Sequence, residues 1–72
     1  MKYETWKAGN GDYSSDDRLS VCIEPDGMAN VGYVCRIDAS TWIIENDTQK
    51  RTFRHENEAA ATLVREFEEA EG

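Results

Sequence analysis

Two apolar runs on either side of a tight turn constrain this chain most, because together they specify an antiparallel hairpin. Leu19, Val21 and Ile23 alternate with polar or small residues, which is the period of a half-buried strand. The segment 25–27 reads Pro-Asp-Gly, in which proline presets the first turn position and glycine accepts a positive φ. A second alternating segment follows over residues 29–37, with apolar residues at positions 31, 33, 35 and 37. We therefore expect a β-hairpin closed by a three-residue loop.

The length of that loop sets the register of the hairpin. A three-residue loop places apolar residues opposite one another, and the expected pairs are Glu24–Met28, Ile23–Ala29, Val21–Val31 and Leu19–Tyr33. A four-residue loop would place Val21 opposite Gly32 and break this match. The inner face of the second strand is then expected to carry Val31, Tyr33, Cys35 and Ile37. Val34 would lie on the outer face, together with Ile43 and Cys22.

Three further segments complete a predicted meander. Residues 2–7 favour a first strand, and the polar, glycine-rich segment 8–17 is expected to be a flexible loop. A two-residue loop at 39–40 leads into a strand at 41–45, with expected pairs Ile37–Trp42 and Cys35–Ile44. A turn at 46–47 would return the chain through Phe53, on the same side as Trp42, and this return segment is a candidate fifth strand.

The C-terminal segment has the pattern of an amphipathic helix over about residues 56–71. Apolar residues recur at i, i+3, i+4 and i+7, namely Ala60, Leu63, Val64 and Phe67. His55 and Glu58 stand where a capping box would, and Asn57 is the alternative cap. The expected fold is α+β: an antiparallel meander of four to five strands with one C-terminal helix packed on one face.

The length of 72 residues indicates a single domain spanning 1–72. A chain this short buries about 60% of the surface that its unfolded form exposes, which leaves little room for a substrate cavity. We therefore expect no enzyme activity. No apolar run approaches the length of a membrane span, and the N-terminus lacks the apolar region of a signal peptide, so a cytoplasmic location is expected.

The cysteines and the single histidine give no sign of redox or metal chemistry. In the expected register Cys22 lies on the outer face, exposed, and Cys35 lies in the core, so they cannot form a disulfide. His55 at a helix start is expected to cap or to face solvent. A zinc site would need ligands from both faces of the sheet, so no metal and no cofactor are expected.

The charge is strongly acidic and unevenly distributed. The chain has 15 acidic and 8 basic residues, a net charge of −7, and residues 56–72 contribute six glutamates against one arginine. A negative field repels phosphates, so direct nucleic-acid or membrane binding is not expected, whereas a basic protein surface is an expected partner. The small basic cluster of Lys50, Arg51 and Arg54 is expected to pair with the glutamates that follow it.

Two acidic groups are candidate partner contacts. The first crowds the last turns of the helix, where the dipole disfavours negative charge, and comprises Glu66, Glu68, Glu69 and Glu71. The second lies in the first loop and comprises Asp12, Asp16 and Asp17. The loop aspartates lack the spacing of an EF-hand, so a calcium site is not expected there.

These features favour a small, acidic, non-enzymatic binding protein that occupies a basic, nucleic-acid-binding surface of a host protein. Small acidic proteins with a sheet and a helix occur among phage and mobile-element inhibitors, including anti-CRISPR proteins, and the analogy is one of size and charge. The alternative is a homo-oligomeric structural or assembly protein that associates through its sheet, for example as a homodimer. An apolar outer patch of Val34, Ile43 and Cys22 would serve that role.

Overall fold

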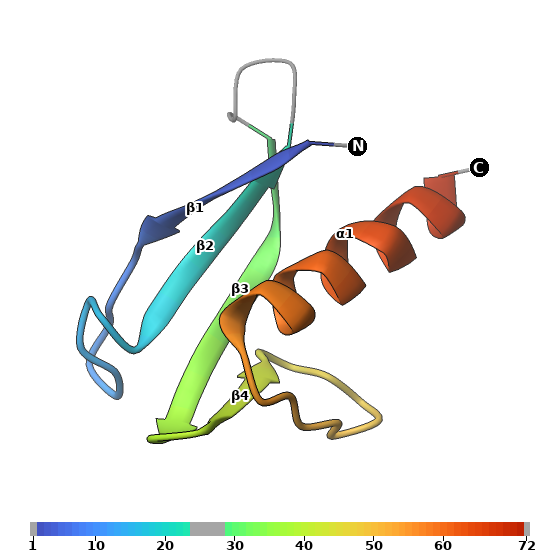
Figure 1. Cartoon of the computed structure of the whole chain (residues 1–72). Coiled ribbons are helices and arrows are strands. Elements are labelled where there is room, and N and C mark those ends of the chain that lie inside the picture. The colour runs from blue at the N-terminus through green and yellow to red at the C-terminus, as the bar shows by residue number, and fades with distance from the viewer. Residues whose placement is uncertain (1, 24–28, 72) are drawn as a thin grey trace.

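The computed structural model describes residues 2–23 and 29–71 and shows a four-stranded antiparallel sheet with one helix packed against it (Figure 1). The elements are β1 (Tyr3–Lys7), β2 (Arg18–Ile23), β3 (Ala29–Asp38), β4 (Thr41–Ile44) and α1 (Glu56–Glu71). The strand order is β1-β2-β3-β4, so every strand pairs with its neighbour in the chain. The predicted α+β meander is confirmed. The predicted turn at 25–27 and the Glu24–Met28 pair lie outside the described residues.

A β-bulge changes the expected register of the β2–β3 hairpin. Ile23 pairs with Ala29 as predicted, but the register shifts between Val21 and Cys22, so that Val21 pairs with Gly32 and not with Val31. The extra residue on β3 reverses the faces of every later β3 residue. The predicted Leu19–Tyr33 pair is therefore wrong, and Leu19 pairs with Val34.

The bulge also corrects the predicted assignment of residues to faces. Val34, predicted on the outer face, is fully buried in the core. Cys35 is fully buried as predicted, but it lies on the opposite face of the sheet, outside the core cluster. Cys22, predicted to be exposed, is 7% exposed. Ile43 pairs with Cys35 and shares its outer face, where it is half-buried.

A second irregularity lies near the β3–β4 turn. Asp38 pairs with Thr41, which agrees with a two-residue loop, but Arg36 and not Ile37 pairs with Trp42. The skipped residue, Ile37, is 50% exposed and so does not belong to the inner face as predicted. The predicted Cys35–Ile44 pair is likewise wrong, because Ile44 pairs with Val34. The second shift keeps Val34 and Ile44 together in the core.

The segment that returns from β4 makes a single bridge and no fifth strand. Trp42 and Phe53 exchange two backbone hydrogen bonds, with N···O distances of 2.6 and 2.8 Å. Phe53 therefore lies on the Trp42 side, as predicted. Asn46 and Lys50 have positive φ angles of 65° and 53°, which turn the intervening loop sharply.

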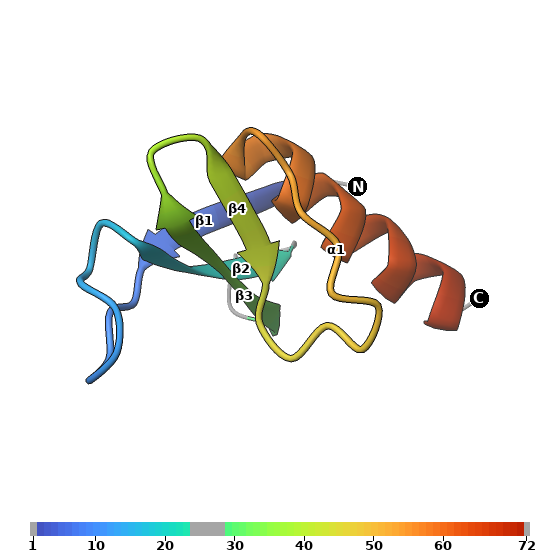
Figure 2. The ribbon, with the colours of Figure 1, turned by 90° about the horizontal axis from the view of Figure 1, so that it is seen from below.

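The helix α1 spans residues 56–71 and covers β3, β4 and part of β2 (Figure 2). Its small residues Ala59 and Ala60 are fully buried, so its axis can approach the sheet closely. The core consists of Leu19, Val21, Ile23, Val34, Ile44, Ala59, Ala60 and Val64, with Phe67, Leu63, Phe53, Trp42, Val31 and Tyr3 packed at its margin. Among residues 2–23 and 29–71, no helix lies on the other face of the sheet.

Gly32 leaves room for Leu63 of α1 to pack against β3. Its φ is +152°, a value that L-residues with a side chain rarely adopt. A Cβ at this position would lie 2.8 Å from Leu63 Cδ2. The glycine therefore permits the backbone conformation next to the bulge and also leaves space for Leu63 to pack on β3.

Candidate functional site

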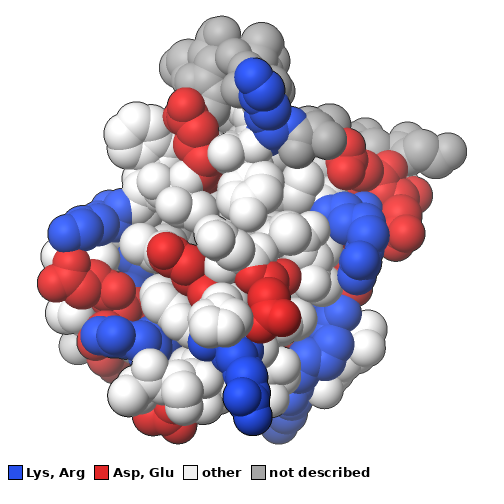
Figure 3. Space-filling model, viewed as in Figure 1, with Lys and Arg blue, Asp and Glu red and all other residues white. Residues whose placement is uncertain are grey.

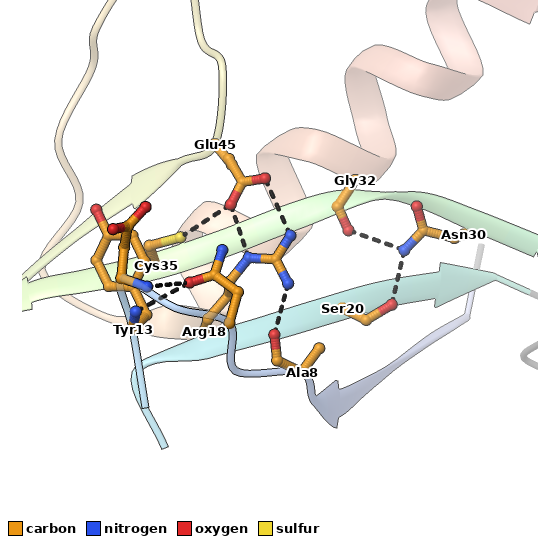
Figure 4. A network of polar contacts seen from close by, with 10 residues as sticks. Ala8, Tyr13, Arg18, Ser20, Asn30, Gly32, Cys35 and Glu45 are labelled. Carbon is orange, nitrogen blue, oxygen red and sulfur yellow. Dashed lines mark hydrogen bonds and ion pairs between the residues drawn. The ribbon is translucent and has the colours of Figure 1, made fainter. Parts of the chain in front are cut away.

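The face of the sheet opposite α1 carries a polar network centred on Arg18 (Figure 4). The guanidinium of Arg18 donates to both carboxylate oxygens of Glu45, at 2.7 and 3.1 Å, and also to the carbonyl of Ala8. Its carbon Cζ lies 3.8 Å from the centroid of the Tyr33 ring. Arg18 therefore reaches from β2 over β3 to the residue that follows β4. The hydrogen bonds from Arg18 lower the pKa of the Glu45 carboxyl.

The thiol of Cys35 is buried beside this network and hydrogen-bonded to it. Cys35 Sγ lies 3.6 Å from a carboxylate oxygen of Glu45, which accepts its hydrogen bond. Burial first, and the adjacent negative charge of Glu45 second, raise the pKa of the Cys35 thiol to about 11. The thiol is therefore protonated at neutral pH, and this environment is the reverse of the one that activates a nucleophilic cysteine.

Cys22 belongs to a separate polar group on the same face. Its sulfur lies 3.3 Å from Ser20 Oγ, and Ser20 Oγ accepts a hydrogen bond of 2.6 Å from the side-chain amide of Asn30. Cys22 pairs with Asn30, whereas Cys35 pairs with Arg18 at the other end of β2. Both thiols are free, as predicted, but their separation along the strands, and not opposite faces, keeps them apart.

The helix α1 begins with a modified capping arrangement. The carbonyl of His55 accepts the backbone N–H groups of Glu58 and Ala59. The carboxylate of Glu58 accepts the backbone N–H of Arg54 at 3.3 Å, one residue before the position expected for a capping box. The imidazole of His55 is exposed, as the sequence predicts.

A second arginine fastens α1 to the loop that precedes it. The guanidinium of Arg51 donates to Asp47 Oδ2 at 3.1 Å and to both carboxylate oxygens of Glu66, at 2.5 and 2.9 Å. We call Asp47, Arg51 and Glu66 the Arg51 clamp. For Arg51, this confirms the predicted pairing of the basic cluster with the helix glutamates. Glu66, a candidate partner contact, therefore takes part in an interaction within the chain.

Of the three candidate aspartates in the first loop, two form ion pairs within the chain. Asp16 pairs with Lys7 at 2.8 Å, and Asp17 pairs with Arg36 at 2.6 Å. The loop itself is turned by Asn10, whose side-chain oxygen accepts the backbone N–H groups of Asp12 and Tyr13. The carboxylate of Asp12 has no ion-pair partner among residues 2–23 and 29–71.

The candidate glutamates near the end of α1 differ in exposure and in their interactions. Glu69 is exposed and has no ion-pair partner within the described part of the chain, whereas Glu68 is half-buried and does interact with another group. The side chain of Glu71 lies outside the described residues. In Figure 3, acidic side chains gather at the C-terminal end of α1, with a basic side chain beside them.

Over the described ranges, no three His, Cys, Asp or Glu side chains converge as a metal ion would require, and no pocket opens in the surface. None of the helices described is long and apolar enough to cross a membrane. Comparison with protein-family models, curated proteins and solved structures finds no match to this chain. The features of this chain that bear on function are therefore its charges and its exposed surfaces.

The Arg51 clamp predicts a specific pH dependence of stability. Hydrogen bonds from Arg51 lower the pKa of both Asp47 and Glu66 below their ordinary values of 3.8 and 4.5. A carboxyl with a lowered folded-state pKa contributes stability above its unfolded pKa and loses it as the pH falls through the folded value. The melting temperature should therefore fall as the pH is lowered below about 4.5.

The matched comparison is Arg51→Met against Lys50→Met, because both substitutions remove one positive charge from adjacent residues. Arg51→Met should lower the melting temperature at pH 7 and flatten its decline below pH 4.5, whereas Lys50→Met should leave the profile unchanged. Thermal melts followed by circular dichroism between pH 2 and pH 7 measure both profiles. Equal profiles for the two variants would show that the clamp contributes no stability.

Proposed function

We propose that this protein is a small, acidic, non-enzymatic binding protein that occupies a basic surface of a partner protein. The proposed contact surface is the C-terminal end of α1 around the exposed Glu69, and Asp12 forms a second acidic point in the loop after β1. The proposed partner uses the same basic surface to hold nucleic acid. An inhibitor from a phage or mobile element, in the manner of an anti-CRISPR protein, is the kind of protein that would work in this way.

The charge that remains after internal pairing carries this proposal. Four basic side chains, Lys7, Arg18, Arg36 and Arg51, pair with five acidic ones in the described residues. Those nine groups account for a charge of only −1 out of the total of −7. The ion pairs among residues 2–23 and 29–71 therefore leave most of the net negative charge in place.

Negative charge at the C-terminal end of α1 is unfavourable for the stability of the helix. The last turn of α1 contains no basic residue, although the negative end of the helix dipole favours one. A lysine or arginine supplied by a partner would complement both the glutamates and the dipole. Carboxylates held along a helix can in this way occupy basic side chains that otherwise bind phosphates, with fast and salt-sensitive association.

The test is an affinity pull-down of tagged protein from native lysate at low and at high salt, with mass spectrometry of the recovered proteins. We expect a nucleic-acid-handling protein that is recovered at low salt and lost at high salt. The purified chain should then displace nucleic acid from that protein. Recovery of no protein other than the chain itself would contradict the proposal.

The helix end can be tested against a matched site on the same helix. Glu69→Gln and Glu56→Gln remove the same charge from opposite ends of α1. Glu69→Gln should weaken binding of the recovered partner about two- to fivefold at low salt, and Glu56→Gln should not. Titration of each variant against the partner gives the two dissociation constants. Equal losses for both variants would indicate general charge attraction without a defined site.

A further inference from the structure

The two edges of the sheet are finished differently. At β4 the outer edge is occupied by Phe53, which exchanges two backbone hydrogen bonds with Trp42. The outer edge of β1 has no such cover from the described residues, and Glu4–Lys7 are all exposed. Figure 1 shows β1 along the open side of the sheet, away from α1. An uncovered edge strand is a template for pairing with another strand.

The pairing of β1 with β2 shows which backbone groups remain open. Ala8 N–H donates to the carbonyl of Arg18, the residue opposite it in the register. Hydrogen-bonded pairs alternate along an antiparallel ladder, so Glu4 and Trp6 also bond to β2. The N–H and C=O groups of Tyr3, Thr5 and Lys7 therefore point outward from the sheet.

We propose that a second copy of this chain binds at this edge, with the two β1 strands antiparallel about a twofold axis at Thr5. Thr5 then faces the second copy's Thr5, and Tyr3 faces the second copy's Lys7. Every outward N–H and C=O group of the strand finds a partner, which gives about six hydrogen bonds between the chains. The result is one continuous eight-stranded sheet with both helices on the same face.

The register centred on Thr5 pairs the whole of β1 and places no like charges opposite each other. Glu4 lies opposite the second copy's Trp6, so no like charges face each other. A shift of two residues in one direction places Glu4 opposite the second copy's Glu4, which is unfavourable. A shift in the other direction pairs Tyr3 with Gly9, which lies beyond the strand.

Trp6 favours a second copy over an unrelated strand as the occupant. At 56% exposure it is the most exposed large apolar side chain of the described chain, and it lies on the face opposite α1. In the proposed register the two Trp6 side chains are diagonal neighbours on that face, within reach of each other. Self-association would therefore cover the apolar surface that the monomer leaves open. This inference does not depend on the proposed partner, and its failure would leave the acidic surface unaffected.

Sedimentation velocity of the full chain over about 1–500 µM tests the proposal, because an interface this small is expected to be weak. The mass should rise with concentration from 8.2 kDa toward twice that value. Thr5→Pro removes an outward N–H without touching the β1–β2 ladder, and should weaken the dimer about tenfold or more. Thr5→Val, which keeps the N–H, is the control and should dimerise as the natural chain does.

Cysteine cross-linking supplies a second, register-specific readout. Residues directly opposite in a hydrogen-bonded pair have Cα atoms about 5.5 Å apart, within disulfide range, whereas diagonal neighbours are beyond it. Thr5→Cys should therefore form a covalent dimer on oxidation, and Glu4→Cys and Trp6→Cys should not. A chain that stays monomeric at the highest concentration would overturn the proposal. So would a dimer that is unaffected by Thr5→Pro, or cross-linking that is equal at all three positions.

Discussion

Replacing Val34 with aspartate is expected to unfold the domain. Val34 is fully buried between β2 and β4, opposite Leu19 on one side and Ile44 on the other. A carboxylate there loses its hydration and has no partner in an apolar core, at a cost of about 4 kcal/mol or more. A small domain has a total stability of about that size. Far-ultraviolet circular dichroism and urea unfolding of Val34→Asp measure the loss.

Ile37→Asp is the matched control, because it makes the same chemical change three residues along the same strand. Ile37 is 50% exposed, so its replacement should alter the free energy of unfolding by no more than about 0.5 kcal/mol. A regular β3 without the bulge would give the opposite ranking, with Ile37 in the core and Val34 on the outer face. A stable Val34→Asp and an unfolded Ile37→Asp would therefore refute the bulged register.

Gly32→Ala is expected to give the second large effect, a loss of about 1–3 kcal/mol in the free energy of unfolding. The φ of +152° is strained for any residue with a Cβ, and the new methyl group would lie 2.8 Å from Leu63 Cδ2. Gly11→Ala is the control, because no atom lies within 4 Å of a Cβ at that position. Chemical denaturation of both variants, compared at equal slope, measures the difference.

A double-mutant cycle separates the two causes of the Gly32 effect. Leu63→Ala removes the clashing atoms and leaves the backbone strain in place. If the contact with Leu63 matters, the double variant should be less destabilised than the sum of the two single variants, by about 0.5 kcal/mol or more. Additive losses would assign the whole effect to the backbone.

The strand and helix elements follow from sequence periodicity, but the bulge does not. Alternation identifies β2 and the apolar stripe identifies α1, because each pattern depends on neighbours in the chain. The position of the bulge does not follow from periodicity, because both possible registers of β3 place apolar side chains in the core. The regular register would bury Val31, Tyr33, Cys35 and Ile37, and the bulged register buries Val34. The informative signal was Gly32, because a glycine inside a strand often marks a bulge or a close backbone approach.

The acidic character of the candidate surface was predictable, whereas its division into paired and unpaired carboxylates was not. Arg18 and Glu45 are 27 residues apart, and only the sheet brings them together. Arg51 and Glu66 were within the reach of sequence reasoning, because a basic cluster precedes an acidic helix. Which glutamate takes the arginine depends on the rotation of α1 against its loop, and that rotation is set by the packing of Leu63 and Val64 on the sheet.

The sequential strand order has a consequence for how the chain reaches this structure. Each strand needs only its chain neighbour, so pairing closes short loops at small entropic cost and can proceed in the order of synthesis. The helix is the last element, and it supplies Ala59, Ala60 and Val64 to the core. A nascent sheet would therefore present Leu19, Val21 and Val34 to solvent until α1 emerges. During that interval the growing chain would expose apolar surface that can drive aggregation.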